Sequence, residues 1–225
     1  MKTQQQILSI LGMCLALFVS AQSLPQGFEK IEDVLPDVVL ELRYAGTNNF
    51  MGRQVRGYTS PKVVLTSATL VALKKAQQYF SEKGVGIKLF DGYRPQKAVD
   101  DFVAWAKIES DTLTKSNYYP KIAKNRLFEA GYIAHRSGHS RGSTIDITLV
   151  YTRGPRRGEE LNMGSPWDFF GPISWVESPE INATQKANRL LLQSIMTRCG
   201  FRSYSKEWWH FTLINEPFPD TYFDF

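Results

Sequence analysis

Helical and strand patterns follow one another irregularly along this 225-residue chain, and their order constrains the fold more than any other feature. Apolar residues spaced three and four apart predict helices over 67–82, 95–108 and about 184–198. Short alternating or β-branched runs predict strands over 38–44, 86–91, 145–150 and 209–213. Neither a βαβ rhythm nor an internal repeat connects these segments. We therefore expect a single α+β domain with a mostly antiparallel central sheet and flanking helices.

The composition is that of a globular protein with a core. Apolar residues make up 43% of the chain and charged residues 22%, which excludes disordered, collagen-like and coiled-coil chains. The formal charge is +5, and the only long basic cluster is Arg153, Arg156 and Arg157. Nothing in this pattern indicates a nucleic-acid partner.

The N-terminal segment, residues 1–21, is predicted to be an export signal. An apolar run over 7–19 ends in Val19-Ser20-Ala21, a small-residue site of the kind that signal peptidase cleaves. The run is shorter than the roughly 20 residues that a spanning helix needs, so we expect cleavage and no stable membrane anchor. The mature domain, 22–225, is expected to be exported to the periplasm. Its single cysteine, Cys199, allows no internal disulfide.

Two of the three histidines stand in sequence contexts that suit a metal ion. His139 is flanked by glycines and is followed seven residues later by Asp146, and His210 follows Glu207 by three residues. Two imidazoles and one carboxylate form the ligand set of a catalytic zinc, which leaves the fourth position to water. Asp146 alternates with apolar residues in its strand and should face away from the core. Glu207 should lie in the turn before the last strand, as a general base for that water.

Two other interpretations fit parts of this pattern. His135 lies four residues before His139, as in a helical zinc motif, but the nearby glycines disfavour a helix and no glutamate follows His135. We therefore leave His135 out of the metal site. Residues 138–142 match the G-x-S-x-G elbow of serine hydrolases, with Ser140 as nucleophile. That elbow needs a helix after the serine, whereas a strand is predicted here, so a serine hydrolase ranks below a metal enzyme.

A longer set of motifs resembles a known family. The runs are Ser137-x-His139-x-x-Gly-x-x-x-Asp146, Glu207-x-x-His210, Asp91-Gly-Tyr-Arg94-Pro95, Leu42-Arg-Tyr-Ala45, Asn48-Asn-Phe50 and Met163-Gly-x-x-Trp-Asp168. Together they resemble the D-alanyl-D-alanine dipeptidases of the M15 metallopeptidases, the VanX type. The runs occur in the family's order and cover most of the chain after residue 22.

The resemblance implies a fold and a metal centre. The fold would be α+β, with one Zn²⁺ per chain on the sheet, held by His139, Asp146 and His210. Glu207 would act as the base, and Arg94 would be the cation that polarises the substrate carbonyl. A zinc ion and a fixed guanidinium would both stabilise the oxyanion that amide hydrolysis produces.

The resemblance also implies the substrate, a small dipeptide. Ser137 would help to bind its carboxylate and Asp168 would pair with its ammonium group. Asp168 lies in the long loop 151–180, which has no periodicity and is predicted to cover a site. The expected activity is hydrolysis of D-alanyl-D-alanine in cell-wall peptide metabolism. A D,D- or L,D-carboxypeptidase acting on longer stem peptides and a non-catalytic cell-wall binding module are the alternatives, and the oligomeric state stays open.

Overall fold

The computed structural model describes residues 24–59 and 62–225, and the predicted export signal lies outside the described residues. The strands are β1 (Phe28–Lys30), β2 (Val39–Leu40), β3 (Val64–Thr66), β4 (Val85–Asp91), β5 (Thr144–Tyr151), β6 (Phe201–Tyr204) and β7 (Glu207–Leu213). The α-helices are α1 (Ile31–Val34), α2 (Ser67–Glu82), α3 (Gln96–Ala106), α4 (Lys115–Tyr118) and α5 (Ala183–Arg198). Short 3₁₀ turns are η1 (Arg43–Ala45), η2 (Lys124–Arg126), η3 (Gly138–Arg141) and η4 (Pro172–Ser174).

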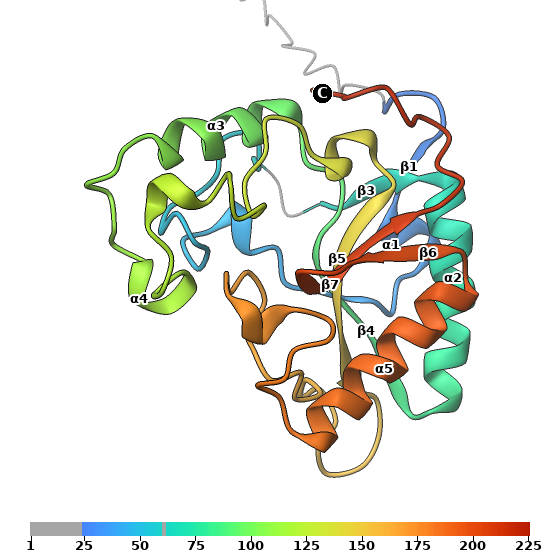
Figure 1. The fold of residues 1–225 in the computed structure, drawn as a ribbon. Helices are drawn as coiled ribbons and strands as arrows, with labels where there is room; N and C mark the ends of the chain where they lie inside the picture. The colour runs from blue at the N-terminus through green and yellow to red at the C-terminus, as the bar shows by residue number, and fades with distance from the viewer. Residues whose placement is uncertain (1–23, 60–61) are drawn as a thin grey trace, which may run out of the picture.

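A five-stranded sheet forms the centre of the molecule, in the order β2-β4-β5-β7-β6 (Figure 1). Only β2 and β4 run parallel, and the other neighbouring pairs are antiparallel. A second, two-stranded sheet pairs β1 with β3. The predicted α+β domain with a mostly antiparallel sheet is therefore confirmed.

Two long helices, α2 and α5, lie side by side along the sheet, α2 against β4 and α5 against β6 and β7 (Figure 1). The predicted stripe of α2 is buried, with Leu70, Leu73 and Phe80 at most 1% exposed. Thr66 caps this helix, because its hydroxyl accepts the Thr69 N–H. No helix in the described ranges is both long and apolar enough to cross a membrane.

The central strand β5 is buried on both faces, which differs from the predicted strand with one polar face. Ile145 faces the core as expected, but Asp146 and Thr148 are also buried, at 2% and 0% exposure. Asp146 is covered by the 151–180 loop, whose Trp167 donates its indole N–H to Asp146 Oδ2 at 3.3 Å and stacks on Phe90 of β4. Asp146 thus points away from the apolar side of β5, but into a second enclosed layer rather than into solvent.

The predicted strand over 38–44 is wrong in its second half. Only Val39–Leu40 pair with β4, and the chain then tightens into η1. This turn buries Tyr44 to 2% exposure, where its hydroxyl donates a 2.6 Å hydrogen bond to Asp168. A contact with a residue so far along the chain leaves no local signal. Helix α3 begins at Gln96 with Pro95 as its cap, close to the predicted start.

Candidate active site

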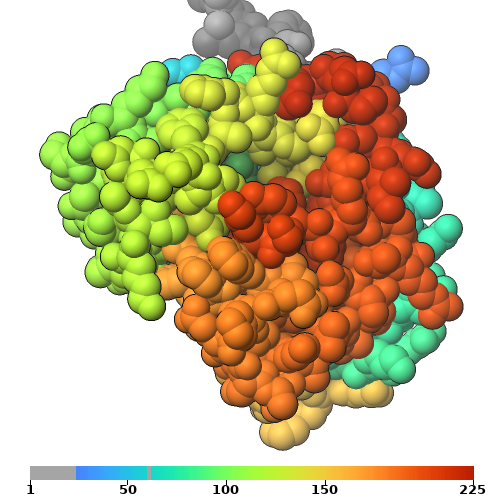
Figure 2. Space-filling view, in the orientation of Figure 1, coloured from blue at the N-terminus to red at the C-terminus, as the bar shows by residue number. Residues whose placement is uncertain are grey.

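All seven side chains that the sequence singles out line one cavity of about 300 Å³. They are Arg94, Ser137, His139, Asp146, Asp168, Glu207 and His210. Figure 2 shows the surface hollowed where the green to yellow segments, the orange loop and the red C-terminal strands meet. Residues spread over more than half of the chain therefore converge on a single site.

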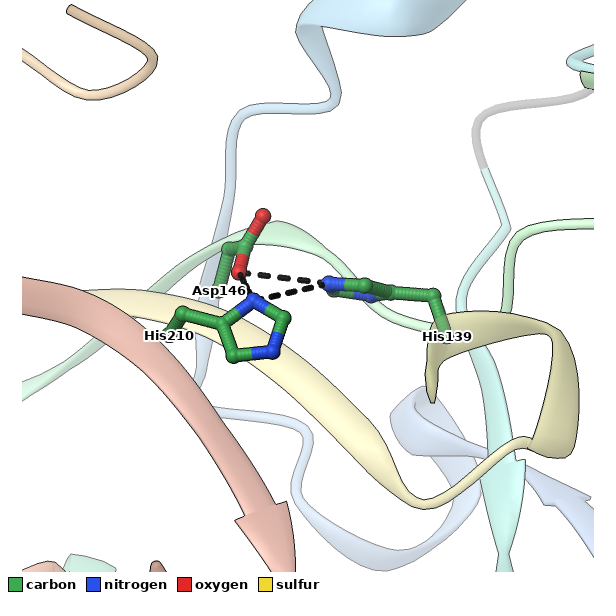
Figure 3. Close-up of side chains that lie close together, drawn as sticks. All are labelled: His139, Asp146 and His210. Atoms are coloured by element: carbon green, nitrogen blue, oxygen red, sulfur yellow. Dashed lines mark hydrogen bonds and ion pairs between the residues drawn. The ribbon is translucent and has the colours of Figure 1, made fainter. Parts of the chain in front are cut away.

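Three of these residues form a tight cluster in which their side chains point toward one another (Figure 3). The Asp146 Oδ1 atom lies 3.3 Å from His139 Nε2 and 3.1 Å from His210 Nδ1. The two imidazole nitrogens are 3.4 Å apart. Each residue thus offers one ligand atom to a common centre.

The backbone fixes the place of each residue in this cluster. Asp146 and His210 are direct partners in the register of β5 and β7. His139 lies in η3, where the Ser137 hydroxyl accepts the His139 backbone N–H. Gly142 then takes φ +79° and returns the chain to β5, and a Cβ there would clash with the Phe28 ring. Only glycine fits that turn.

The His139 ring is held in one orientation by the backbone. Its Nδ1 lies 2.8 Å from the Gly92 carbonyl oxygen, at the end of β4. A carbonyl oxygen can only accept, so Nδ1 carries the proton and Nε2 presents a lone pair to the cluster. A backbone carbonyl that fixes the tautomer in this way is the usual second partner of a metal-binding histidine.

The cluster fits a tetrahedral metal ion. Bonds of about 2.0–2.1 Å to nitrogen and oxygen place neighbouring ligands of a tetrahedral zinc roughly 3.3 Å apart, close to the separations observed here. The Asp146 Oδ1 atom is also buried without a hydrogen-bond partner of acceptable geometry among the described residues. Burial opposes ionisation of this carboxyl, but His139 and His210 outweigh it and lower the pKa of Asp146. A buried carboxylate oxygen that faces two imidazole nitrogens in this way is well suited to bind a cation.

Glu207 lies beside the cluster, but its position differs from the prediction. It is the first residue of β7 rather than part of the preceding turn. In a regular strand, Glu207 and His210 would point to opposite faces, because side chains alternate. A register shift next to Ser203 interrupts the pairing of β6 with β7 and brings Glu207 Oε2 to 3.5 Å from His210 Nδ1.

The environment of Glu207 suits proton transfer near neutral pH. Burial and the charge of Asp146 raise its pKa to about 8, although Arg94 acts in the opposite direction. A carboxyl group whose pKa lies near neutral pH can both take up and release a proton at the pH of the reaction.

Arg94 is a largely buried cation, with 11% of its side chain exposed, and Asp91 holds its guanidinium. Its Nε and Nη2 atoms lie 2.9 and 2.8 Å from Asp91 Oδ2, and Nη2 is 3.8 Å from Asp146 Oδ2. The guanidinium carbon lies 5.1 and 5.0 Å from the ring centres of Tyr44 and Phe102. Burial disfavours the charge, but Asp91 raises the pKa of Arg94 well above its usual value. The site therefore contains a permanent positive charge of fixed position.

Asp168 and Ser137 complete the predicted set. Asp168 is 5% exposed and takes φ 62°, a left-handed conformation that is rare outside glycine. Burial and the charges of Asp146 and Glu207 raise the pKa of Asp168 well above its ordinary value, although the Tyr44 hydroxyl lowers it. The Ser137 hydroxyl is the cap of η3, so its visible contact is with the backbone of that turn.

The structure disfavours both alternatives that the sequence analysis ranked lower. His135 is exposed and stacks on Phe128, outside the metal-type cluster. Ser140 is 0% exposed within η3, does not line the cavity, and is followed by strand β5 rather than by a helix. A nucleophilic serine would need an accessible hydroxyl beside a histidine.

Sequence reasoning missed the residues that position these groups. Asp91 accepts hydrogen bonds from Arg94 and from the Tyr58 hydroxyl, the latter at 2.7 Å. Tyr44 holds Asp168, and Trp167 holds Asp146. Asp91, Tyr44 and Trp167 all stand inside the quoted motifs. The motifs marked these three residues but indicated none of their contacts.

Comparison with known proteins places the chain in a family. A family model described as D-ala-D-ala dipeptidase, Peptidase_M15, matches residues 25–225. The D-alanyl-D-alanine dipeptidase of Streptomyces coelicolor is 43% identical over 198 residues, which cover 88% of this chain and 96% of the relative. The enzyme of the same name from Enterococcus faecalis is 44% identical over 199 residues, covering 88% and 97%. A solved vancomycin resistance D,D-pentapeptidase, VanY, in complex with Zn(II) is 15% identical, covers 68% of this chain and 74% of its own, and has a TM-score of 0.40.

The match to the family model and the match to these relatives agree. The model extends over nearly all of the described residues, and both relatives are matched over almost their full length. The resemblance found in the motifs is therefore confirmed across the whole domain, and the chain belongs to the D-Ala-D-Ala dipeptidase family of M15 metallopeptidases.

Proposed function

We propose that this protein hydrolyses the free dipeptide D-alanyl-D-alanine to two molecules of D-alanine at a single zinc ion. The observation that carries the proposal is the cluster of His139, Asp146 and His210, whose buried Asp146 Oδ1 has no hydrogen-bond partner among the described residues. A carboxyl with a raised pKa and a fixed guanidinium line the same cavity. Two relatives that match almost end to end have names that state this activity.

His139, Asp146 and His210 would hold the metal, and three protein ligands leave a position for water. When bound, the zinc ion supplies Lewis acidity, which lowers the pKa of a water molecule and polarises a carbonyl. The Gly92 carbonyl fixes the His139 ring for this purpose, and the Trp167 indole fixes the second oxygen of Asp146. The ligands therefore need little reorganisation on metal binding.

Glu207 and Arg94 divide the remaining chemistry. Glu207 accepts a proton from the attacking water at its carboxylate and later delivers a proton to the leaving amino group. Arg94 faces the developing oxyanion with a charge that Asp91 and two aromatic rings already hold in place. Fixed charges of this kind act without reorganisation during the reaction.

Asp168 supplies a binding site for the substrate ammonium group. In the cavity it is buried beside other carboxylates, and this raises its pKa. An ammonium group next to it would lower that pKa again and leave an ion pair. Recognition of a free amino group favours a dipeptide over the interior of a longer peptide.

The test combines metal content with turnover. The purified protein should contain about one zinc per chain and release D-alanine from D-alanyl-D-alanine, and a chelator should abolish both. Added zinc should restore activity. Full activity after removal of the metal, together with inactivation by a serine-directed phosphonylating reagent, would reject the proposal.

We propose further that the protein is exported and acts in cell-wall peptide metabolism. The support is the apolar run over 7–19 and the small-residue site at Val19-Ser20-Ala21. Mass spectrometry of the mature protein should give an N-terminus near Gln22, with the protein in the periplasmic fraction. An uncleaved N-terminus in the cytosolic fraction would contradict this assignment.

A further inference from the structure

The lining of the cavity contains one charged side chain that the proposed reaction does not use. Besides the histidines, its charged groups are the carboxylates of Asp146, Asp168 and Glu207 and the cations Arg94 and Arg136. Arg94 is buried and paired with an aspartate. Arg136 is exposed at the rim and forms none of the ion pairs found in the described part of the chain.

Arg136 lines the same cavity as the metal-type cluster, and one aromatic ring restricts its guanidinium. It lies three residues before His139, and its guanidinium carbon is 4.9 Å from the ring centre of Tyr222. Tyr222 is itself anchored to η3, because the next residue, Phe223, donates its backbone N–H to the Ser140 carbonyl at 2.8 Å. The ring thus restricts the guanidinium to the rim without neutralising its charge.

A free dipeptide at neutral pH carries one ammonium and one carboxylate group. Asp146, Glu207 and Arg94 are engaged in the metal and the reaction, and Asp168 in binding the ammonium group, which leaves Arg136 as the one charge of the lining without an assigned role. Asp168 and Arg136 then match the two ends of the dipeptide in sign. The carboxylate lies one residue beyond the scissile carbonyl, about 3.8 Å along the chain, so its partner must lie near the metal cluster.

We infer that Arg136 binds the C-terminal carboxylate of the substrate, with the adjacent Ser137 hydroxyl as a second donor. This inference rests on the proposed function. A guanidinium presents two parallel N–H donors that match the two oxygens of a carboxylate. Arg136 would therefore select peptides that end at the residue after the scissile bond and reject those that continue beyond it.

The test compares a substrate that has the carboxylate with one that lacks it. Wild-type protein and Arg136→Gln are assayed with D-alanyl-D-alanine and with D-alanyl-D-alaninamide. For the free acid, the substitution should raise KM by about 10- to 100-fold and change kcat by less than about threefold. For the amide, kcat/KM should change by less than about threefold. Arg136→Lys should restore part of the affinity, because it keeps the charge but not the fork.

Two further measurements separate binding from structure. Arg157→Gln removes another exposed arginine, on the 151–180 loop outside the cavity, and should leave both substrates unaffected. In a Glu207→Ala background, which is not expected to turn over, calorimetry should show the same loss of D-alanyl-D-alanine affinity when Arg136→Gln is added. An equal loss of kcat/KM with the acid and the amide, or an unchanged KM for the acid, would overturn the role of Arg136. Either result would leave the proposed function standing. A wild-type protein that cleaves no D-alanyl-D-alanine would overturn the proposed function and this inference with it.

Discussion

The two faces of the central sheet are covered by different kinds of structure. On one face, the regular helices α2 and α5 pack along the strands. On the other face, the turn η1 and the 151–180 loop place Tyr44 and Trp167 over the carboxylates of the site. The first face buries apolar side chains that recur with a helical period. On the second face, the buried carboxylates of Asp146 and Asp168 are each paired with an individual hydrogen-bond donor. We therefore expect substitutions on the helical face to lower stability without changing the chemistry, and substitutions on the irregular face to change the chemistry.

The largest loss of activity should come from removing a metal ligand. His210→Ala should lose the zinc and reduce turnover by more than about a thousandfold, because water is not activated at neutral pH without the metal. Metal analysis of the purified variant checks the first part and a D-alanine assay the second. His135→Ala, which removes an exposed histidine outside the cluster, is the control and should keep both properties. A zinc-loaded His210→Ala protein would refute the ligand set.

A substitution on the helical face should lower stability and leave activity unchanged. Leu73 is 0% exposed in α2, and Leu73→Ala should lower the free energy of unfolding by about 2–5 kcal/mol. The kcat of the folded variant should stay close to that of the wild type, because no lining residue of the cavity is removed. Denaturant titration and kinetics on the same sample measure both. A large drop in kcat at full zinc occupancy would mean that the two faces are not separable.

Glu207→Ala should rank next among the activity losses. The variant should keep its zinc, since all three ligands remain, and should lose roughly a hundred- to ten-thousandfold in kcat through loss of the base. Glu180→Ala, an exposed glutamate on the 151–180 loop, is the matched control. Loss of the metal from Glu207→Ala would instead make Glu207 a ligand.

Arg94→Ala should affect both activity and stability. It removes a donor that acts mainly in the transition state, so kcat should fall by roughly a hundred- to a thousandfold with little change in KM. It also leaves Asp91 buried without its cation, at a cost of about 3–5 kcal/mol in the free energy of unfolding. Arg94→Lys should recover only part of kcat. A raised KM with unchanged kcat would assign Arg94 to substrate binding.

The contrast between the two faces also explains how far the sequence could be interpreted. The helix over 67–82 was predicted with the bounds that α2 has, because its apolar residues repeat every three or four positions. Tyr44 was placed in a strand, since its partner Asp168 is 124 residues away and leaves no local pattern. The bulge that turns Glu207 toward His210 was equally hidden, although the E-x-x-H spacing itself was visible. The spacing of apolar residues indicates which side of a helix or strand is buried. Contacts between polar residues far apart in the chain leave no such spacing, and only motifs indicate them.

The smallest of these kinetic effects should come from Asp168, the residue that the irregular face holds for substrate selection. Asp168→Asn is compatible with the left-handed backbone at this position, because asparagine tolerates positive φ, and it removes the charge alone. Its effect should therefore be confined to substrates with a free ammonium group. For D-alanyl-D-alanine, kcat/KM should fall by about tenfold to a hundredfold, the value of a hydrogen-bonded charge.

N-acetyl-D-alanyl-D-alanine and a stem pentapeptide should be poor substrates of the wild type. Neither places a free ammonium group beside the scissile residue, so binding either one leaves the buried Asp168 without a cationic partner. Asp168→Asn should therefore narrow the difference between these peptides and the dipeptide, whereas the exposed control Asp37→Asn should leave it unchanged. Equal kcat/KM values for the pentapeptide and the dipeptide in the wild type would favour a carboxypeptidase. They would also locate the selective contacts of this site somewhere other than on the 151–180 loop, while the metal cluster on β5 and β7 would keep its role.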